Sequence, residues 1–335
     1  MSTTDVEAVA QLNEARDRIY DEVGKVIVGQ REVIGQMLTA LLAGGHCLLV
    51  GVPGLAKTTL VQVLAKTLDL SFGRIQFTPD LMPSDITGTE VLEEDGESGR
   101  KTFRFIRGPI FAHVLLADEI NRTPPKTQAA LLQAMQEHAV TVGGDTMALG
   151  APFFVLATQN PIEQEGTFPL PEAQLDRFLM HVKIGYPEAA AEADILRLAR
   201  DRAREQMHPP AMAVERMPLE DVFRARAQVL DLHLAPALER YLIELVLASR
   251  DAARYDATLA RRIAWGASPR GSIALERCAR ARAWLAGRDY VTPDDIRAIA
   301  PDVLRHRVLP SYEATAEGWD GDRLVKALLD VVPLP

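Results

Sequence analysis

The sequence of residues 51–58, GVPGLAKT, decides the fold of this chain. The apolar run at 46–50 precedes it, and apolar residues at helical spacing follow it over 60–68. A strand, a glycine-rich turn and a helix in this order let backbone N–H groups converge on a polyphosphate at the positive end of the helix. The stretch therefore predicts a phosphate-binding loop, although an ordinary turn before a helix would also satisfy so short a motif.

Two side chains at the end of this loop carry the expected chemistry. Lys57 is placed to reach the β- and γ-phosphates, and the Thr58 hydroxyl is placed to hold Mg²⁺. Ala56 stands where the pattern G-x-x-x-x-G-K-[ST] has its last glycine. The motif is thus one residue away from the usual pattern.

Length and composition limit the possible classes of protein. A chain of 335 residues with 47% hydrophobic and 25% charged residues predicts a globular protein of about two domains. Its net charge of −9 argues against a nucleic-acid partner, which usually shows as a basic patch. No apolar stretch reaches the ~18 residues of a membrane span, and the N-terminus lacks the apolar region of a signal peptide. With Cys47 and Cys278 as its two cysteines, we expect a cytoplasmic protein without disulfides or zinc.

A second group of chemical residues follows the apolar run at 114–117. A continuous apolar run is typical of a buried parallel strand, and ligands bind at the carboxyl ends of such strands. Asp118 is placed there to act on the Mg²⁺ shell, and Glu119 is placed to polarise an attacking water. Without the phosphate-binding loop, the same pair would be an unremarkable helix cap.

A third apolar run, 153–157, leads to Asn160. An amide at the end of a core strand could orient the hydrolytic water against the γ-phosphate. A lone Asn-Pro pair is more often just a turn. The position after a third strand favours the functional interpretation.

Two hairpins are predicted between the core elements, at about 89–106 and about 139–149. The first has two β-like runs around a polar turn, and the second turns at Gly143-Gly144. Either a surface excursion or a loop that contacts a substrate or partner fits the first hairpin.

Strand-like runs stop near residue 187, where we place a domain boundary. Helices are predicted over 188–206, 219–230, 236–253, 271–286 and 293–300. Arg270 lies in the first turn of one of them, where the interaction of its positive charge with the helix macrodipole costs ~0.3–1 kcal/mol. A nearby anion would remove that cost. Arg277, Arg280 and Arg282 cluster in the same helix, where a solvated face and a subunit interface both fit.

Taken together in this order, the motifs resemble the MoxR family of AAA+ ATPases, within the clade that carries a helix-2 insert. The matching segments are VGQ (28–30), GVPGLAKT (51–58), LLADEINR (115–122), ATQNP (157–161), LPEAQLDRF (170–178) and SPRGS (268–272). An alanine at position 56 is itself usual in this family. The resemblance implies an α/β fold: an AAA+ P-loop αβα sandwich with a parallel sheet over 1–186, followed by a small all-helical lid domain over 187–335.

The resemblance also implies a role for each matching residue. Glu119 belongs to Walker B with Asp118, Asn160 matches sensor 1, Arg177 the arginine finger and Arg270 sensor 2. The hairpin at 89–106 corresponds to the helix-2 insert, and that at 139–149 to the pre-sensor hairpin. Thr58 and Asp118 are the expected Mg²⁺ residues. The residues implied to contact ATP are Val28, Gly29, Gln30, Gly51, Val52, Pro53, Gly54, Leu55, Ala56, Lys57, Thr58, Thr59 and Asp118.

Such proteins are Mg²⁺-dependent ATPases that form rings, usually hexamers. They act as chaperone-like motors that remodel, assemble or activate protein clients, often with a von Willebrand factor A-domain partner. A nucleotide-gated scaffold with little turnover would use the same loop, and a magnesium-chelatase-like motor subunit shares the clade. The intact Glu119, Asn160 and Arg177 argue against the scaffold, while the sequence leaves the chelatase alternative open.

Overall fold

The computed structural model describes residues 30–52, 57–94, 101–162, 165–186 and 218–335, with isolated positions between 17 and 21 and between 189 and 200. The helix predicted over 188–206 falls outside these ranges except at those isolated positions. The predicted domain boundary near 187 also falls outside them and remains a prediction. Among the described residues, no helix has both the length and the apolar character that crossing a membrane requires.

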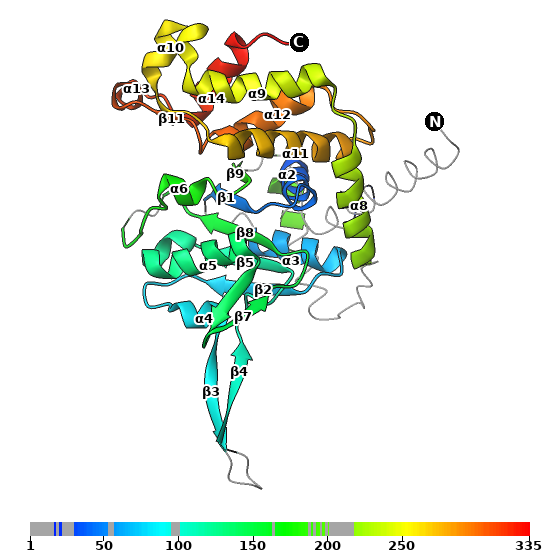
Figure 1. Cartoon of the computed structure of the whole chain (residues 1–335), viewed down its shortest axis with the longest axis vertical. Helices are drawn as coiled ribbons and strands as arrows, with labels where there is room; N and C mark the ends of the chain where they lie inside the picture. Colours follow the sequence, from blue (N-terminus) through cyan, green and yellow to red (C-terminus); the bar gives the residue numbers. More distant parts are fainter. Residues whose placement is uncertain are drawn as a thin grey trace, which may run out of the picture.

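A five-stranded parallel sheet forms the centre of the protein (Figure 1). In sheet order its strands are β2 (Phe72–Gln76), β5 (Val114–Asp118), β8 (Phe154–Gln159), β1 (Cys47–Gly51) and β9 (Met180–Ile184). Successive side chains alternate between two cores: Leu49 packs on one face and Leu48 on the other. Because both faces are covered, the strands are continuous apolar runs, which explains why the sequence signals them so clearly.

Helices cover both faces of the sheet, as the predicted αβα sandwich requires. Residues of α2 and α3 belong to the core on one face, and residues of α4 and α5 to the core on the other. The bounds of these helices are α2 (Arg31–Leu42), α3 (Lys57–Thr67), α4 (Pro83–Thr87) and α5 (Pro125–Glu137). The short helix α6 spans Glu172–Leu175, and a 3₁₀ turn spans Ile120–Arg122. Helix α4 is short because it begins at Pro83 and ends at Gly88, whose φ of 100° suits glycine.

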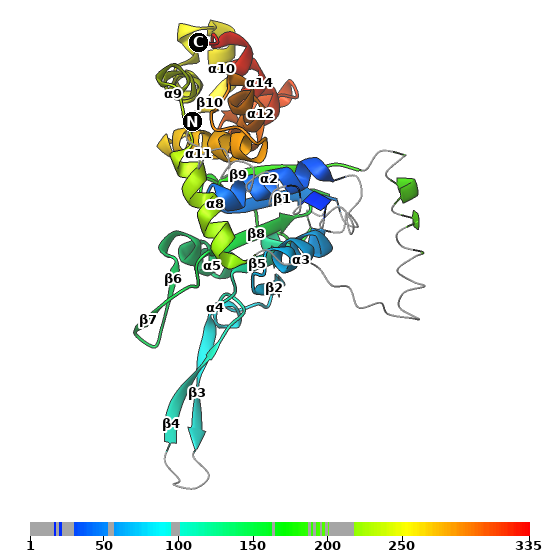
Figure 2. The same ribbon diagram turned by 90° about the vertical axis from the view of Figure 1, so that its right-hand side faces the viewer.

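Antiparallel pairs occupy both stretches for which hairpins are predicted. Strands β3 (Gly88–Glu94) and β4 (Lys101–Arg107) form the longer pair, and β6 (Ala139–Val142) and β7 (Asp145–Ala148) the shorter one. Figures 1 and 2 show both pairs projecting from the end of the molecule away from the lid helices. The longer hairpin therefore extends away from the packed body, whereas the shorter one stays joined to it through Val140 and Met147.

The C-terminal region is a lid built almost entirely of helices. They are α8 (Leu219–Asp231), α9 (Pro236–Arg250), α10 (Ala257–Arg262), α11 (Pro269–Leu285), α12 (Pro293–Leu304), α13 (Tyr312–Ala316) and α14 (Gly321–Val331), with a 3₁₀ turn at Ala252–Arg254. Side chains of Ser268, Thr292 and Asp320 cap α11, α12 and α14. The lid differs from the all-helical prediction at one place, where the short strand β10 (Ile263–Trp265) pairs with β11 (Leu309–Pro310). So short a pair has no periodicity that a sequence pattern can reveal.

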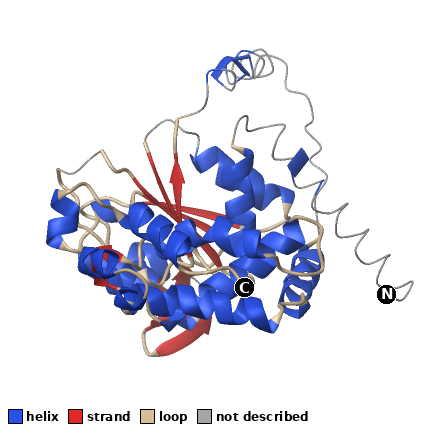
Figure 3. Ribbon diagram, turned by 90° about the horizontal axis from the view of Figure 1, so that it is seen from above, coloured by secondary structure: helices blue, strands red, loops and turns tan. Residues whose placement is uncertain are grey.

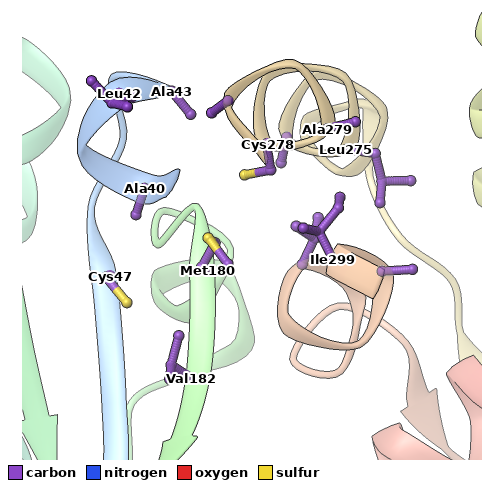
Figure 4. Packing of buried hydrophobic residues seen from close by; sticks show 14 of the residues in the cluster. Ala40, Leu42, Ala43, Cys47, Met180, Val182, Leu275, Cys278, Ala279 and Ile299 are labelled. Carbon is purple, nitrogen blue, oxygen red and sulfur yellow. The ribbon is translucent and has the colours of Figure 1, made fainter. Parts of the chain in front are cut away.

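The lid packs directly on the core through α2. Seen from above, helices surround the strands of the sheet (Figure 3). Figure 4 shows Ala40 of α2, Met180 of β9, Cys278 of α11 and Ile299 of α12 in one buried cluster. A polar contact joins the same layers, because the amide of Gln36 donates to Asp302 at 2.6 Å. Sheet, α2 and lid therefore share one continuous hydrophobic core. Both cysteines are free and buried, as predicted for Cys47.

Candidate nucleotide site

The parallel sheet brings three of the predicted residues to its carboxyl edge. Lys57 begins the helix after β1, Asp118 ends β5, and Asn160 follows β8. Strands β5, β8 and β1 are neighbours in the sheet, so the three side chains converge on one edge. The predicted residues Val28, Gly29 and 53–56 lie outside the described residues.

Lys57 extends its ammonium group back over the end of β1. Nζ donates to the backbone carbonyls of Gly51 and, at 3.3 Å, Val52. Burial lowers the pKa of Lys57, while the negative charges of Asp118 and Glu119 oppose that shift. Within the described part of the chain only neutral carbonyl oxygens accept from this ammonium. Its charge is therefore available for an anionic ligand.

Asp118 is buried and held by two donors. The Thr158 hydroxyl donates to Oδ1 at 2.6 Å, and the Arg74 guanidinium pairs with Oδ2 at 2.7 Å. The same hydroxyl accepts a hydrogen bond from the Glu119 backbone N–H at 2.8 Å. Thr158 thus fixes the two successive carboxylate residues relative to β8.

Glu119 lies in an uncommon backbone conformation, with φ of 58° and ψ of 50°. Non-glycine residues in this left-handed region are rare and cluster at functional sites. Its Oε2 accepts from Gln76 at 2.9 Å and pairs with Arg122 at 2.9 Å. The carboxylate is therefore oriented by both a neighbouring strand and its own turn.

Asn160 is 6% exposed and only partly hydrogen-bonded. Its Oδ1 accepts from the Ile162 backbone N–H at 3.2 Å, whereas Nδ2 is buried and lacks a partner among the described residues. Leaving a buried donor unpaired costs about 1–3 kcal/mol, so such a group in a native structure needs an explanation. A ligand oxygen at the carboxyl edge would supply the missing acceptor.

Arg177 and Arg270 lie at the opposite edge of the sheet. Both line a cavity of about 200 Å³ beside Gly45, just before β1 begins. The four steps along β1, at ~3.3 Å each, separate the two edges by about 13 Å. The predicted catalytic residues therefore form two pairs: Glu119 and Asn160 at one edge, Arg177 and Arg270 at the other.

Sequence reasoning missed three residues that contact the carboxylates: Arg74, Gln76 and Thr158. A signal for the first two exists, since they are separated by one residue and therefore point to the same face of a strand. Their targets depend on β2 lying beside β5, with Gln76 opposite Asp118. Local sequence patterns do not reveal that strand order.

The Thr158 hydroxyl donates to Asp118 and accepts from the Glu119 backbone, and we call this pair of hydrogen bonds the clamp between β5 and β8. Replacing Thr158 by valine tests it. The isosteric change leaves Asp118 without one donor and the Glu119 N–H without its acceptor, so we expect a loss of about 1–3 kcal/mol in the free energy of unfolding. Urea denaturation measures it. Thr39→Val is the matched control, because among the described residues the buried Thr39 hydroxyl bonds only to Gly35 in its own helix. Equal losses in the two variants would contradict the clamp.

Both the sheet-containing core and the lid are similar to known protein domains. Residues 46–180 match the model of the ATPase family associated with various cellular activities (AAA), and residues 256–328 match the AAA lid domain. A crystal structure of a protein from Cytophaga hutchinsonii described as an ATPase superposes with a TM-score of 0.88. It is 43% identical and covers 99% of this chain and 98% of its own. The fold is thus that of an AAA+ ATPase with its lid.

Two relatives define the family more closely. Chaperone MoxR1 of Mycobacterium tuberculosis is 42% identical over 95% of this chain and 82% of its own length. Protein YeaC of Bacillus subtilis is 44% identical over 95% of this chain and 94% of its own. The chain belongs to the MoxR family of AAA+ ATPases.

Proposed function

We propose that this protein is a Mg²⁺-dependent ATPase that assembles into a ring, in which each subunit completes the site of its neighbour and the ring remodels protein clients. The observation that carries the proposal is the division of the site between two opposite edges. One edge holds an ammonium, two carboxylates and a buried amide, and the other presents arginines. Neither edge is complete alone.

The carboxyl edge suits a nucleoside triphosphate and its metal. The Lys57 ammonium, which donates only to neutral carbonyls among the described residues, and the unpaired Asn160 donor both favour phosphate oxygens. Thr58 and Asp118 would hold Mg²⁺, which neutralises charge that develops on the phosphates. Glu119 accepts a proton from the attacking water, and Asn160 orients that water. The Arg74–Asp118 ion pair competes with the metal for one carboxylate oxygen.

The amino-terminal edge suits the nucleotide of a different subunit. Arg177 and Arg270 lie too far from Lys57 in the same chain, because the length of β1 separates them. In a ring, however, one face of each subunit meets the opposite face of the next. Both arginines therefore act in trans. Arg122 does not fit that role, since it pairs with Glu119 at its own carboxyl edge.

The longer hairpin supports contact with a protein client. Leu92 and Phe103 face each other across β3 and β4, and they are 49% and 73% exposed. Directly opposed residues share one face of a sheet, so these two side chains form an apolar surface far from the packed core. A client segment binds there, and a von Willebrand factor A-domain protein is the partner expected from the family.

Assembly should depend on nucleotide. With ATP and Mg²⁺, light scattering should show particles several times the mass of the 36.8 kDa chain. Lys57→Ala should stay small under the same conditions, because it removes the ammonium that meets the phosphates. Phosphate release by the assembled sample measures turnover in the same experiment. A chain that stays monomeric at every concentration and nucleotide state would rule out the ring, and with it any role in trans for Arg177.

A further inference from the structure

The cavity at the amino-terminal edge lies between the core and the lid. Gly45, Met135 and Arg177 belong to its core side, while Arg270 and Arg277 of α11 belong to its lid side. Arg277 is exposed and follows Arg270 by seven residues, which places both on one face of the helix. The rise of ~1.5 Å per residue separates their Cα atoms by about 10.5 Å along the helix axis.

Asp176 is the single carboxylate among the described residues that line this cavity, and its charge is already neutralised. The buried Arg307 pairs with Oδ1 at 2.7 Å, and the Ser268 hydroxyl donates to Oδ2 at 2.9 Å. Arg270 approaches the same carboxylate only to 3.9 Å. Burial lowers the pKa of Arg307, and Asp176 opposes that shift, as expected for a structural ion pair.

Arg177 and Arg277 therefore lie at the cavity without a carboxylate partner among the described residues, while Arg270 shares Asp176 with Arg307. Arg177 donates to the neutral Leu132 carbonyl at 2.8 Å. Arg277 has neither a hydrogen bond nor an ion pair with any described residue. Like charges in a partly enclosed space repel each other more strongly than in bulk water, and a bound anion removes that repulsion.

The neighbouring arginines of the same helix have other partners. Arg280 pairs with Glu276 at 2.9 Å and donates to the Leu230 carbonyl, also at 2.9 Å. Arg282 lies 3.6 Å from Asp295. Of the three arginines that cluster in the sequence, Arg277 is the member that faces the cavity.

We propose that Arg277 is a third anion-binding arginine of this cavity, and that it contacts the triphosphate of the nucleotide held by the next subunit together with Arg177 and Arg270. Cations two helical turns apart match an extended polyanion better than a single phosphate. The identity of the ligand as a neighbour's nucleotide rests on the proposed function. The chemistry is shared by free polyphosphate, so the experiment has one arm for each source.

The first arm uses inorganic tripolyphosphate and the full chain carrying Lys57→Ala, which disables the phosphate-binding loop of the same subunit. Isothermal titration should show binding. Adding Arg277→Ala should weaken it about tenfold or more, as expected for loss of a charged hydrogen bond. Adding Arg277→Lys should restore part of the affinity. Arg282→Ala, which removes the same charge from another face of α11, should change the affinity less than about twofold.

Equal affinities in the Arg277→Ala and Arg282→Ala variants would overturn the inference, and so would the absence of any tripolyphosphate binding. Thermal unfolding of each variant shows that it is folded. The second arm measures the KM for ATP in assembled protein with an intact Lys57, where Arg277→Ala should raise it. An unchanged KM would overturn the assignment to the neighbour's nucleotide. Failure of ring assembly is seen separately by light scattering, so it cannot be confused with either result.

Discussion

Arg177→Ala should lower the rate of ATP hydrolysis by about 10³–10⁵-fold while ATP affinity stays nearly intact. That loss corresponds to roughly 4–7 kcal/mol of transition-state stabilisation, whereas an exposed ion pair contributes about 0–1 kcal/mol. The structure favours the larger effect, because Arg177 faces the cavity and has no carboxylate partner among the described residues. Phosphate release and equilibrium nucleotide binding measure the two quantities.

Arg254→Ala is the matched control for this experiment. Arg254 is exposed on the lid and pairs with Asp251 at 2.6 Å, so its loss should change turnover less than about threefold. A fall of less than tenfold in Arg177→Ala would make that residue a surface charge, and Arg270 would become the better candidate.

Mixing variants tests whether Arg177 acts in trans. Arg177→Ala subunits keep an intact carboxyl edge, and Glu119→Gln subunits keep an intact Arg177. In a mixed ring of equal parts, about a quarter of the interfaces combine the two intact halves, so activity should reappear. Each variant alone should remain inactive. A site completed within one chain could not be rescued in this way.

Glu119→Gln should retain ATP binding and lose hydrolysis by about 10²–10⁴-fold, the range for removing a general base. The amide keeps the size of the side chain, but it cannot accept the proton of the attacking water. Asp118 remains held by Thr158 and Arg74, so the metal-binding carboxylate is unchanged. Single-turnover hydrolysis and nucleotide titration check the two halves of this expectation.

Lys57→Ala provides the contrast, because it should abolish nucleotide binding itself. Wild-type turnover in Glu119→Gln would show that the carboxylate assigned to Walker B is not the base. The same variant is a tool for finding clients, since a ring that holds ATP without cleaving it should retain bound proteins during purification.

The core elements could be predicted from sequence because their signals are local. The apolar runs before Lys57, Asp118 and Asn160 each became a buried parallel strand. The helices predicted over 271–286 and 293–300 also overlap α11 and α12. No helix is predicted after residue 300, although Asp320 and the apolar spacing that follows it are typical of a capped amphipathic helix, which α14 is.

Relations between distant segments could not be predicted. The contacts of Arg74 and Gln76 with the carboxylates depend on β2 lying next to β5. The distance between Arg270 and Lys57 depends on which edge of the sheet the lid covers, and no periodicity encodes that choice. Likewise, the sequence shows that Arg277, Arg280 and Arg282 cluster, but only the tertiary packing distinguishes the one that faces the cavity.

The shared core of sheet, α2 and lid has a mechanical consequence. Cys278 and Ile299 of the lid share one buried cluster with Met180 of the sheet, and this cluster joins the part that carries Lys57 to the part that carries Arg270. Close-packed interiors transmit displacement rather than absorb it. We therefore expect core and lid to rotate together as one rigid body. A movement of the residues around the nucleotide at the carboxyl edge would then shift Arg177 and Arg270 at the opposite edge. In the proposed ring, relative movement would then occur at the interfaces between subunits.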